Sequence, residues 1–197
     1  MSLTRKVSVE RNTAETSIKL SLDLNSAGDY SVDTGIPFFD HMLTLFSVHG
    51  FFDLQLRATG DIEVDYHHTM EDVGLVLGEA VAVALGDRKG IRRYGYAVTP
   101  MDDSISSVTI DLSNRPFLVY RIPALFARQT EVYSNLFKEF FRAFANKSGM
   151  NLHVDAPYGE NDHHLIESIF KSFARSLDQA TTIDGRVRNV RSSKGVL

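Results

Sequence analysis

Two copies of a five-residue motif, HHxxE, contain the side chains in this chain best suited to bind a metal ion. The first copy is His67–Glu71 and the second is His163–Glu167, and each stands at the start of an apolar helical run. In a helix, the first His and the Glu lie four residues apart on one face, whereas the second His points about 100° away. Each motif can therefore give its first His and its Glu to one ion, and its second His, His68 or His164, to another.

A single HHxxE at a helix start could be an incidental polar cap, because His and Glu are common at exposed helix ends. A second copy in the corresponding place of a repeated half favours metal binding instead. His41, on an apolar helix, and His153, on a strand, are further candidate ligands, although the first could be a core histidine and the second could simply face water. With both included, six His and two Glu supply three His and one Glu to each of two ions. We interpret His49 as a helix cap and leave it out.

The composition limits the classes of partner. The chain has no cysteine, so a metal must be held by His, Asp or Glu. A net charge of -4 argues against a nucleic-acid surface, and no apolar run approaches the length of a membrane span. The first residues lack an apolar signal core, so we expect a cytoplasmic protein with neither nucleic acid nor membrane as a partner.

The elements that must position these residues follow from periodicity and turn signals. Strands are expected at 4–11, 16–24, 30–33, 51–58, 62–66, 108–112, 117–122 and 151–156, and helices at 37–50, 69–85, 131–146 and 163–180. The order strands, helix, strand, helix occurs twice, which indicates an internal duplication and an α+β fold. We expect half-repeats at 1–92 and 93–184 and a C-terminal tail at 185–197, together forming one compact catalytic domain.

The tail and three other arginines are candidate phosphate ligands. A tail with several cations is usually a solvated terminus, but a small anion needs only a few donors. The tail cations are Arg186, Arg188, Arg191 and Lys194, with Ser192 and Ser193 beside the last. Arg92, Arg93 and Arg115 could equally be surface or turn residues. Glu15, in a polar stretch before a strand, shows no chemical role by pattern alone.

Several longer motifs occur in a fixed order along the whole chain. They are Arg11–Thr16, Phe38–Met42, Asp65–Gly74, Asp111–Pro116, Leu152–His153, Asn161–His164 with Glu167, and Ser192–Gly195. In these motifs the chain resembles the imidazoleglycerol-phosphate dehydratases of histidine biosynthesis. The resemblance implies two sheets sandwiching four helices, each half being ribosomal protein S5 domain 2-like. It also implies dehydration of D-erythro-imidazole-glycerol phosphate to imidazole-acetol phosphate through a metal-stabilised imidazolate intermediate.

The same resemblance implies roles for individual residues and two Mn²⁺ per active site. One ion would be held by His41, His68, His163 and Glu167, and the other by His67, Glu71, His153 and His164. Glu15 is the first choice for the catalytic acid/base, with Glu71 and Glu167 as less favoured alternatives because metal coordination lowers their basicity. Glu15, Arg93, Arg115, Ser193 and Lys194 would bind the substrate.

The resemblance further implies self-association into a 24-subunit assembly built from trimers, with metal ions joining subunits at shared sites. Two other classes of function remain open: a non-catalytic assembly protein with structural metal clips, and a dinuclear metallohydrolase, which usually needs bridging carboxylates. Some dehydratases of this family are fused to a phosphatase. No nucleophile motif of that kind precedes Arg5, so we expect a single activity.

Overall fold

The computed structural model describes residues 5–123 and 131–197, in which two four-stranded sheets enclose four helices. The first sheet contains β1 (Lys6–Asn12), β2 (Thr16–Asp23), β3 (Tyr30–Asp33) and β4 (Asp53–Gly60), in the order β1-β2-β4-β3. The second contains β5 (Tyr94–Met101), β6 (Ser104–Asp111), β7 (Phe117–Arg121) and β8 (Asn151–Tyr158), in the order β5-β6-β8-β7. Both sheets have two antiparallel pairs and one parallel pair. This identical topology confirms the predicted α+β fold and its duplicated unit.

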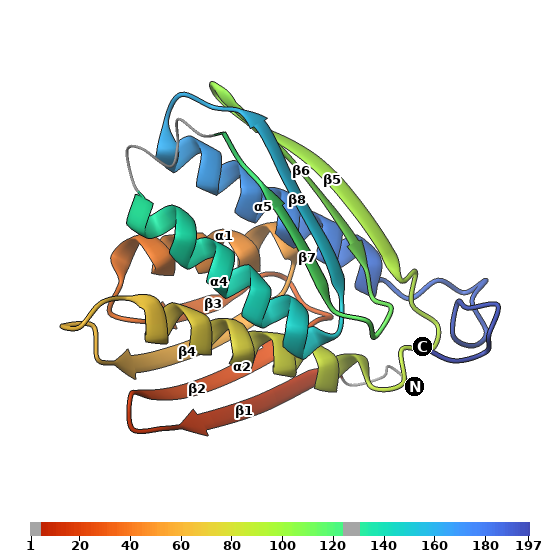
Figure 1. Cartoon of the computed structure of the whole chain (residues 1–197). Coiled ribbons are helices and arrows are strands. Elements are labelled where there is room, and N and C mark those ends of the chain that lie inside the picture. The colour runs from red at the N-terminus through yellow and green to blue at the C-terminus, as the bar shows by residue number, and fades with distance from the viewer. Residues whose placement is uncertain (1–4, 124–130) are drawn as a thin grey trace.

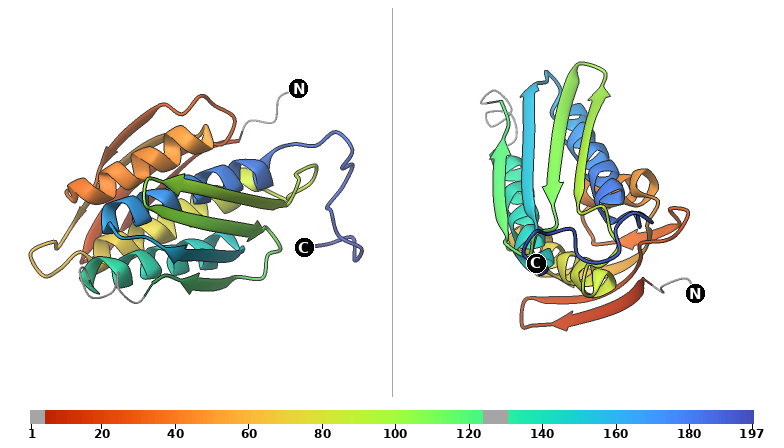
Figure 2. Two further views of the ribbon diagram at one scale, coloured as in Figure 1. Left: turned by 90° about the horizontal axis from the view of Figure 1, so that it is seen from above. Right: turned by 90° about the vertical axis from the view of Figure 1, so that its right-hand side faces the viewer.

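The helices form two layers between the sheets (Figures 1 and 2). They are α1 (Pro37–Gly50), α2 (His67–Leu85), α4 (Glu131–Ser148) and α5 (Asp162–Thr181). In each half the first helix lies between the third and fourth strands, and the second follows the fourth. Helix α2 packs on β1, β2 and β4, and α5 packs on β5, β6 and β8, while α2 also contacts α4 and α1 contacts α5. None of the described helices is both long enough and apolar enough to cross a membrane.

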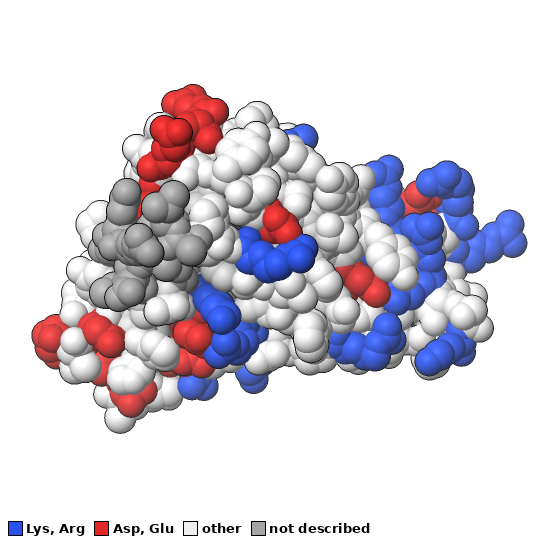
Figure 3. Space-filling model, turned by 45° about the horizontal axis from the view of Figure 1, so that its top comes forward, with Lys and Arg blue, Asp and Glu red and all other residues white. Residues whose placement is uncertain are grey.

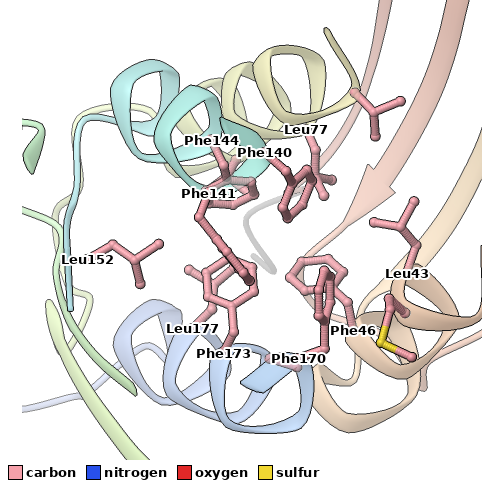
Figure 4. Packing of buried hydrophobic residues seen from close by; sticks show 14 of the residues in the cluster. Leu43, Phe46, Leu77, Phe140, Phe141, Phe144, Leu152, Phe170, Phe173 and Leu177 are labelled. Carbon is pink, nitrogen blue, oxygen red and sulfur yellow. The ribbon is translucent and has the colours of Figure 1, made fainter. Parts of the chain in front are cut away.

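A cluster of phenylalanine rings fills the space between the layers (Figure 4). Phe46 of α1 stacks on Phe173 of α5 at 5.5 Å between ring centroids, and Phe140 of α4 stacks on Phe170 of α5 at 5.7 Å. All four side chains are fully buried. Because a buried aromatic ring removes a large apolar area from water, this cluster is a main source of stability and joins the two halves into one core.

Helices α2 and α4 approach so closely that two glycines are required at their contact. A Cβ on Gly74 would lie 2.6 Å from the carbonyl oxygen of Phe140, and one on Gly78 would lie 2.6 Å from that of Phe144. Both distances are too short for non-bonded atoms. The glycines therefore allow the backbones of the two halves to touch directly.

One expected strand, at 62–66, was wrong, and one observed strand, β5, was not predicted. Residues 62–66 form a turn, in which the N–H of Val64 donates to the carbonyl oxygen of Asp61 at 2.8 Å and Asp65 accepts from the N–H of His67 at 2.7 Å. Because the N–H groups of Val64 and His67 bond to acceptors within the turn, they are not available to pair with a neighbouring strand. Strand β5 was missed because its small residues, such as Gly95, face the core while its large ones face outward. Helix α2 begins at His67, two residues before the expected start, which places its whole motif on the helix.

Candidate metal and phosphate sites

The second HHxxE motif and α1 bring three candidate ligands together. The Nε2 atoms of His41 and His163 lie 3.5 and 3.2 Å from Oε2 of Glu167. One ligand atom from each of the three residues lies within 4.8 Å of the others, which suits a shared divalent cation. The spacing arises because α1 packs beside α5, with the ring centroids of His41 and His163 5.5 Å apart. Asn161 accepts from the N–H of His163 at 2.9 Å and fixes the start of α5.

Glu167 is held ready as an anion by a lysine that the sequence analysis did not single out. Its side chain is only 10% exposed, and its Oε1 accepts from Nζ of Lys171 at 2.6 Å. Burial is the largest influence and raises the pKa of Glu167, but the hydrogen bonds from Lys171 and His41 outweigh it, so the pKa is lowered. Oε2 thus faces the two histidines with its negative charge retained.

The first HHxxE motif forms a separate group at the start of α2. Nε2 of His67 lies 3.2 Å from Oε2 of Glu71, one helical turn away. Nδ1 of His68 lies 3.0 and 3.2 Å from the two carboxylate oxygens of Asp61, and this hydrogen bond raises the pKa of His68. Glu15 is nearby, with Oε2 at 3.9 Å from Nδ1 of His68, and its side chain is 56% exposed.

The hairpin turn that carries Glu15 is anchored to helix α2 by a buried carboxylate. Asp72, on the second turn of α2, accepts from the hydroxyl of Thr16 at 2.5 Å and pairs with Arg11 at 3.2 Å. The N–H of Asp61 also donates to the carbonyl oxygen of Glu15 at 3.2 Å. These contacts tie the hairpin to α2 and keep Glu15 beside the first motif, with its carboxylate exposed to solvent.

His164 and His153 are placed apart from a complete ligand set. Nδ1 of His164 lies 2.5 Å from Oδ1 of Asp103, and this hydrogen bond raises the pKa of His164 and lowers that of Asp103 well below its ordinary value. His153 is exposed on the outer face of β8, between buried Leu152 and Val154. His153 thus faces solvent in one chain, as the alternative to a ligand role allows, and the structure brings neither histidine to the His67–Glu71 group.

Several of the candidate phosphate ligands, but not Arg186 or Arg188, gather in one hollow of about 480 Å³. It is lined by Arg93, Tyr94, Arg115, Arg191, Ser192, Ser193 and Lys194. Arg93 uses Nε and Nη2 to donate to Asp111 at 2.6 and 3.0 Å, and Nη1 to donate to the carbonyl oxygen of Arg191 at 2.6 Å. Two of its five N–H groups are left for an anion. The hydrogen bond to Asp111 raises the pKa of Arg93. Arg92 lies instead 3.8 Å from Asp184.

The metal groups and the phosphate hollow lie at opposite ends of the molecule. Helices α2 and α5 both begin at the left in Figure 1, whereas the C-terminal tail lies at the right. On the face shown in Figure 3, acidic side chains gather near the first end and basic side chains near the second. In the described part of one chain, therefore, no location combines a full set of expected ligands with the phosphate hollow.

Comparison with known proteins identifies the family of this chain. The family model for imidazoleglycerol-phosphate dehydratase matches residues 34–177, a range that contains both motifs and both additional histidines. The chain belongs to the imidazoleglycerol-phosphate dehydratase family. Relatives of that name from Desulfosudis oleivorans and Syntrophobacter fumaroxidans are each 58% identical over 193 residues; both alignments cover 98% of this chain, with 99% of the first relative and 98% of the second.

Solved structures of imidazoleglycerol-phosphate dehydratases confirm the fold. That from Pyrococcus furiosus matches with a TM-score of 0.83 at 34% identity, covering 96% of this chain and all of that one. That from Staphylococcus aureus matches with a TM-score of 0.79 at 33% identity, covering 91% of this chain and 99% of that one.

Three residues that contact candidate ligands were not found from the sequence: Asp61, Asp103 and Lys171. Aspartates in turns and a lysine in a helix have no distinctive spacing.

Proposed function

We propose that this protein catalyses the dehydration of D-erythro-imidazole-glycerol phosphate to imidazole-acetol phosphate, the histidine-biosynthesis step for which its relatives are named. The observation that carries the proposal is the convergence of His41 from α1 with His163 and Glu167 from α5. It joins a histidine outside the motifs to a motif, and the donor atoms are those that borderline divalent ions such as Mn²⁺ accept.

Two Mn²⁺ ions fit the donor sets that the chain offers. One would be held by His41, His68, His163 and Glu167, and the other by His67, Glu71, His153 and His164. When bound, the ions supply Lewis-acid stabilisation of negative charge on the imidazole ring of the substrate. Lys171 keeps Glu167 ionised as a metal ligand. Among the described residues, no carboxylate lies between the His41–His163–Glu167 group and the His67–Glu71 group to bridge two ions, and this disfavours a dinuclear metallohydrolase.

Glu15 is the acid/base that moves a proton at the substrate side chain. Glu71 and Glu167 each contact an imidazole at 3.2 Å and would be occupied as ligands. The carboxylate of Glu15 is 56% exposed and lies 3.9 Å from Nδ1 of His68, and its backbone is fixed at the edge of the first motif. A positioned carboxylate with access to substrate is what general acid–base catalysis requires.

The phosphate would be held by Arg93, Arg115, Ser193 and Lys194. Because this hollow and the HHxxE motifs lie at opposite ends of one chain, a complete site needs residues from neighbouring copies (Figure 1). We therefore infer that metal ions join subunits, in the 24-subunit assembly of trimers expected for the family. Chelation should then reduce the particle mass measured by light scattering, and an undiminished large particle after complete metal removal contradicts this role.

The direct test is product formation. Metal-free protein is incubated with imidazole-glycerol phosphate, with and without Mn²⁺, and imidazole-acetol phosphate is measured by mass spectrometry. Product is expected only with added metal. Absence of product with every divalent metal tested refutes the proposed function.

A Glu15→Gln variant separates an enzyme from a structural metal clip. Turnover is expected to fall by about 10²–10⁴-fold, the usual contribution of general acid–base catalysis, while metal content and particle size stay unchanged. Full activity in this variant assigns the proton transfer to another carboxylate. If the unmodified protein binds metal and assembles but forms no product, it is an assembly protein with structural metal sites.

A further inference from the structure

One aspartate in each half binds the second histidine of the HHxxE motif through the same ring nitrogen. Asp61, in the turn between β4 and α2, lies 3.0 Å from Nδ1 of His68. Asp103, in the turn between β5 and β6, lies 2.5 Å from Nδ1 of His164. An ionised carboxylate can only accept a hydrogen bond, so Nδ1 is the donor in both pairs. The neutral imidazole is then left with an unprotonated Nε2.

The other motif histidines and His41 present the same nitrogen. Nε2 of His41 and of His163 face Glu167 at 3.5 and 3.2 Å, and Nε2 of His67 faces Glu71 at 3.2 Å. In these three histidines Nε2 is thus the nitrogen that faces a candidate carboxylate ligand, and Nε2 of His164 faces the exposed carboxylate of Asp102 at 3.8 Å. In His68 and His164, Nε2 can bind a metal ion only if a partner of Nδ1 holds the proton on Nδ1 and fixes the orientation of the ring.

We propose that Asp61 and Asp103 are positioning residues that fix the Nδ1–H tautomer of His68 and His164 and aim Nε2 of each ring at a metal ion. A metal-bound histidine normally donates its other ring N–H to a carboxylate or carbonyl group, which fixes the ring and strengthens the ligand. The inference rests on the proposed function for the presence of the ions, whereas the tautomers are properties of the metal-free chain.

The duplication shows why two different turns supply these aspartates. Leu22 of β2 pairs with Leu54 of β4, and Ile110 of β6 pairs with Leu152 of β8, so the two registers can be superimposed. Counting back equally from Leu22 and Ile110 reaches Glu15 in the first half and Asp103 in the second. The two hairpin carboxylates occupy equivalent positions.

Equivalent positions have acquired different tasks. Asp103 accepts from His164 and, through Oδ2, from the N–H groups of Glu160 and Asn161 at 2.6 and 2.9 Å, so it is fully engaged. Glu15 is 3.9 Å from His68, because Asp61 already occupies Nδ1. The first half thus orients its histidine from another turn and leaves the hairpin carboxylate free to exchange protons with a substrate.

Asp61 provides the cleaner test, because replacing Asp103 also removes an acceptor from two backbone N–H groups. Metal-free protein with ¹⁵N-labelled histidine rings is studied by NMR at a pH where the rings are neutral, and signals are assigned with His68→Gln and His164→Gln variants. We expect the Nδ1–H tautomer at both histidines in the unmodified protein. Asp61→Ala should shift His68 alone toward Nε2–H, and Asp61→Asn, which retains an acceptor oxygen, should preserve Nδ1–H.

The second readout is the affinity for Mn²⁺, measured by calorimetry. Asp61→Ala should weaken binding of the ion that His68 would hold by about 10–100-fold, and Asp61→Asn should restore most of it. Asp87→Ala, which changes an exposed aspartate paired with Lys89, serves as the surface control and should leave binding unchanged. Nε2–H tautomers in the unmodified protein, or unaltered Mn²⁺ affinity in Asp61→Ala, overturn the proposal. An inactive protein with Nδ1–H tautomers refutes the proposed function alone.

Discussion

Replacing the glutamate of each motif by glutamine should separate metal binding from stability. The two glutamates are matched in sequence position and both contact a histidine at 3.2 Å, but their surroundings differ. Glu167 is 10% exposed and accepts from Lys171, itself 17% exposed, at 2.6 Å, whereas Glu71 is 42% exposed. The sequence motif alone would predict equal effects.

The magnitudes follow from these contacts. In metal-free protein, Glu167→Gln leaves Lys171 charged beside a neutral acceptor. A hydrogen bond to a charged group contributes about 1.5–3 kcal/mol, and one between two charged groups lies at the strong end of this range. Making the acceptor neutral should therefore cost about 1–1.5 kcal/mol. Glu71→Gln removes an exposed contact and should cost less than about 0.5 kcal/mol.

The assay is urea unfolding in the presence of a chelator, at one protein concentration for all variants. Bound Mn²⁺ per chain is measured separately by elemental analysis, and both variants should lose it, because each replaces an anionic ligand by a neutral one. Equal destabilisation by the two variants, or a larger loss in Glu71→Gln, would falsify the assignment of Lys171 as the partner that distinguishes them.

Three further predictions concern packing and pH. Gly95→Ala should destabilise the protein by at least about 3 kcal/mol in urea unfolding, because its Cβ would lie 1.8 Å from the carbonyl oxygen of Ser176. Phe170→Ala should cost about 3–5 kcal/mol in the same assay, since the ring is fully buried. In chelator, the stabilisation by the Asp103–His164 pair, measured by thermal unfolding, should be greatest between about pH 4 and 6.5. It should decline above this range as the pH rises through the raised pKa of His164, and below it as the pH falls through the lowered pKa of Asp103.

Each of these predictions has a matched control. Gly185→Ala adds a methyl group with no atom within 4 Å, and Phe117→Ala removes a ring that is 61% exposed, so both should lie within about 0.5 kcal/mol of the unmodified protein. Asp103→Ala should abolish the pH-dependent part of the stabilisation. Destabilisation by the controls as large as in the core variants, or a pH profile unchanged by Asp103→Ala, contradicts the reasoning.

The repeated architecture could be predicted from the sequence because its signals are local and occur twice. Strand β5 could not, since Gly95 and Ala97 face the core while Tyr94 and Tyr96 are exposed. This inverts the usual pattern, and its cause is the close approach of α5, which no local pattern encodes. A strand was expected at 62–66 because apolar and polar residues alternate there. The sequence does not show that this segment has no neighbouring strand to pair with.

The candidate site was only partly predictable for a similar reason. Spacing within a helix places His163 and Glu167 on one face, and the structure adds His41 to them, as expected for one ion. The separation of His153 and the phosphate hollow from the motifs depends on tertiary and quaternary arrangement. The orienting role of Asp61 depends on a turn folding back over α2, which sequence distance does not reveal.

The glycine contact between α2 and α4 has a mechanical consequence. Any side chain at Gly74 or Gly78 would force α2 away from α4, because a Cβ there would lie 2.6 Å from a carbonyl oxygen of α4. The position of the motif at the start of α2, relative to the second half, therefore depends on this contact with α4. The position of the first HHxxE motif at the surface thus depends on the absence of two side chains in the interior, at Gly74 and Gly78.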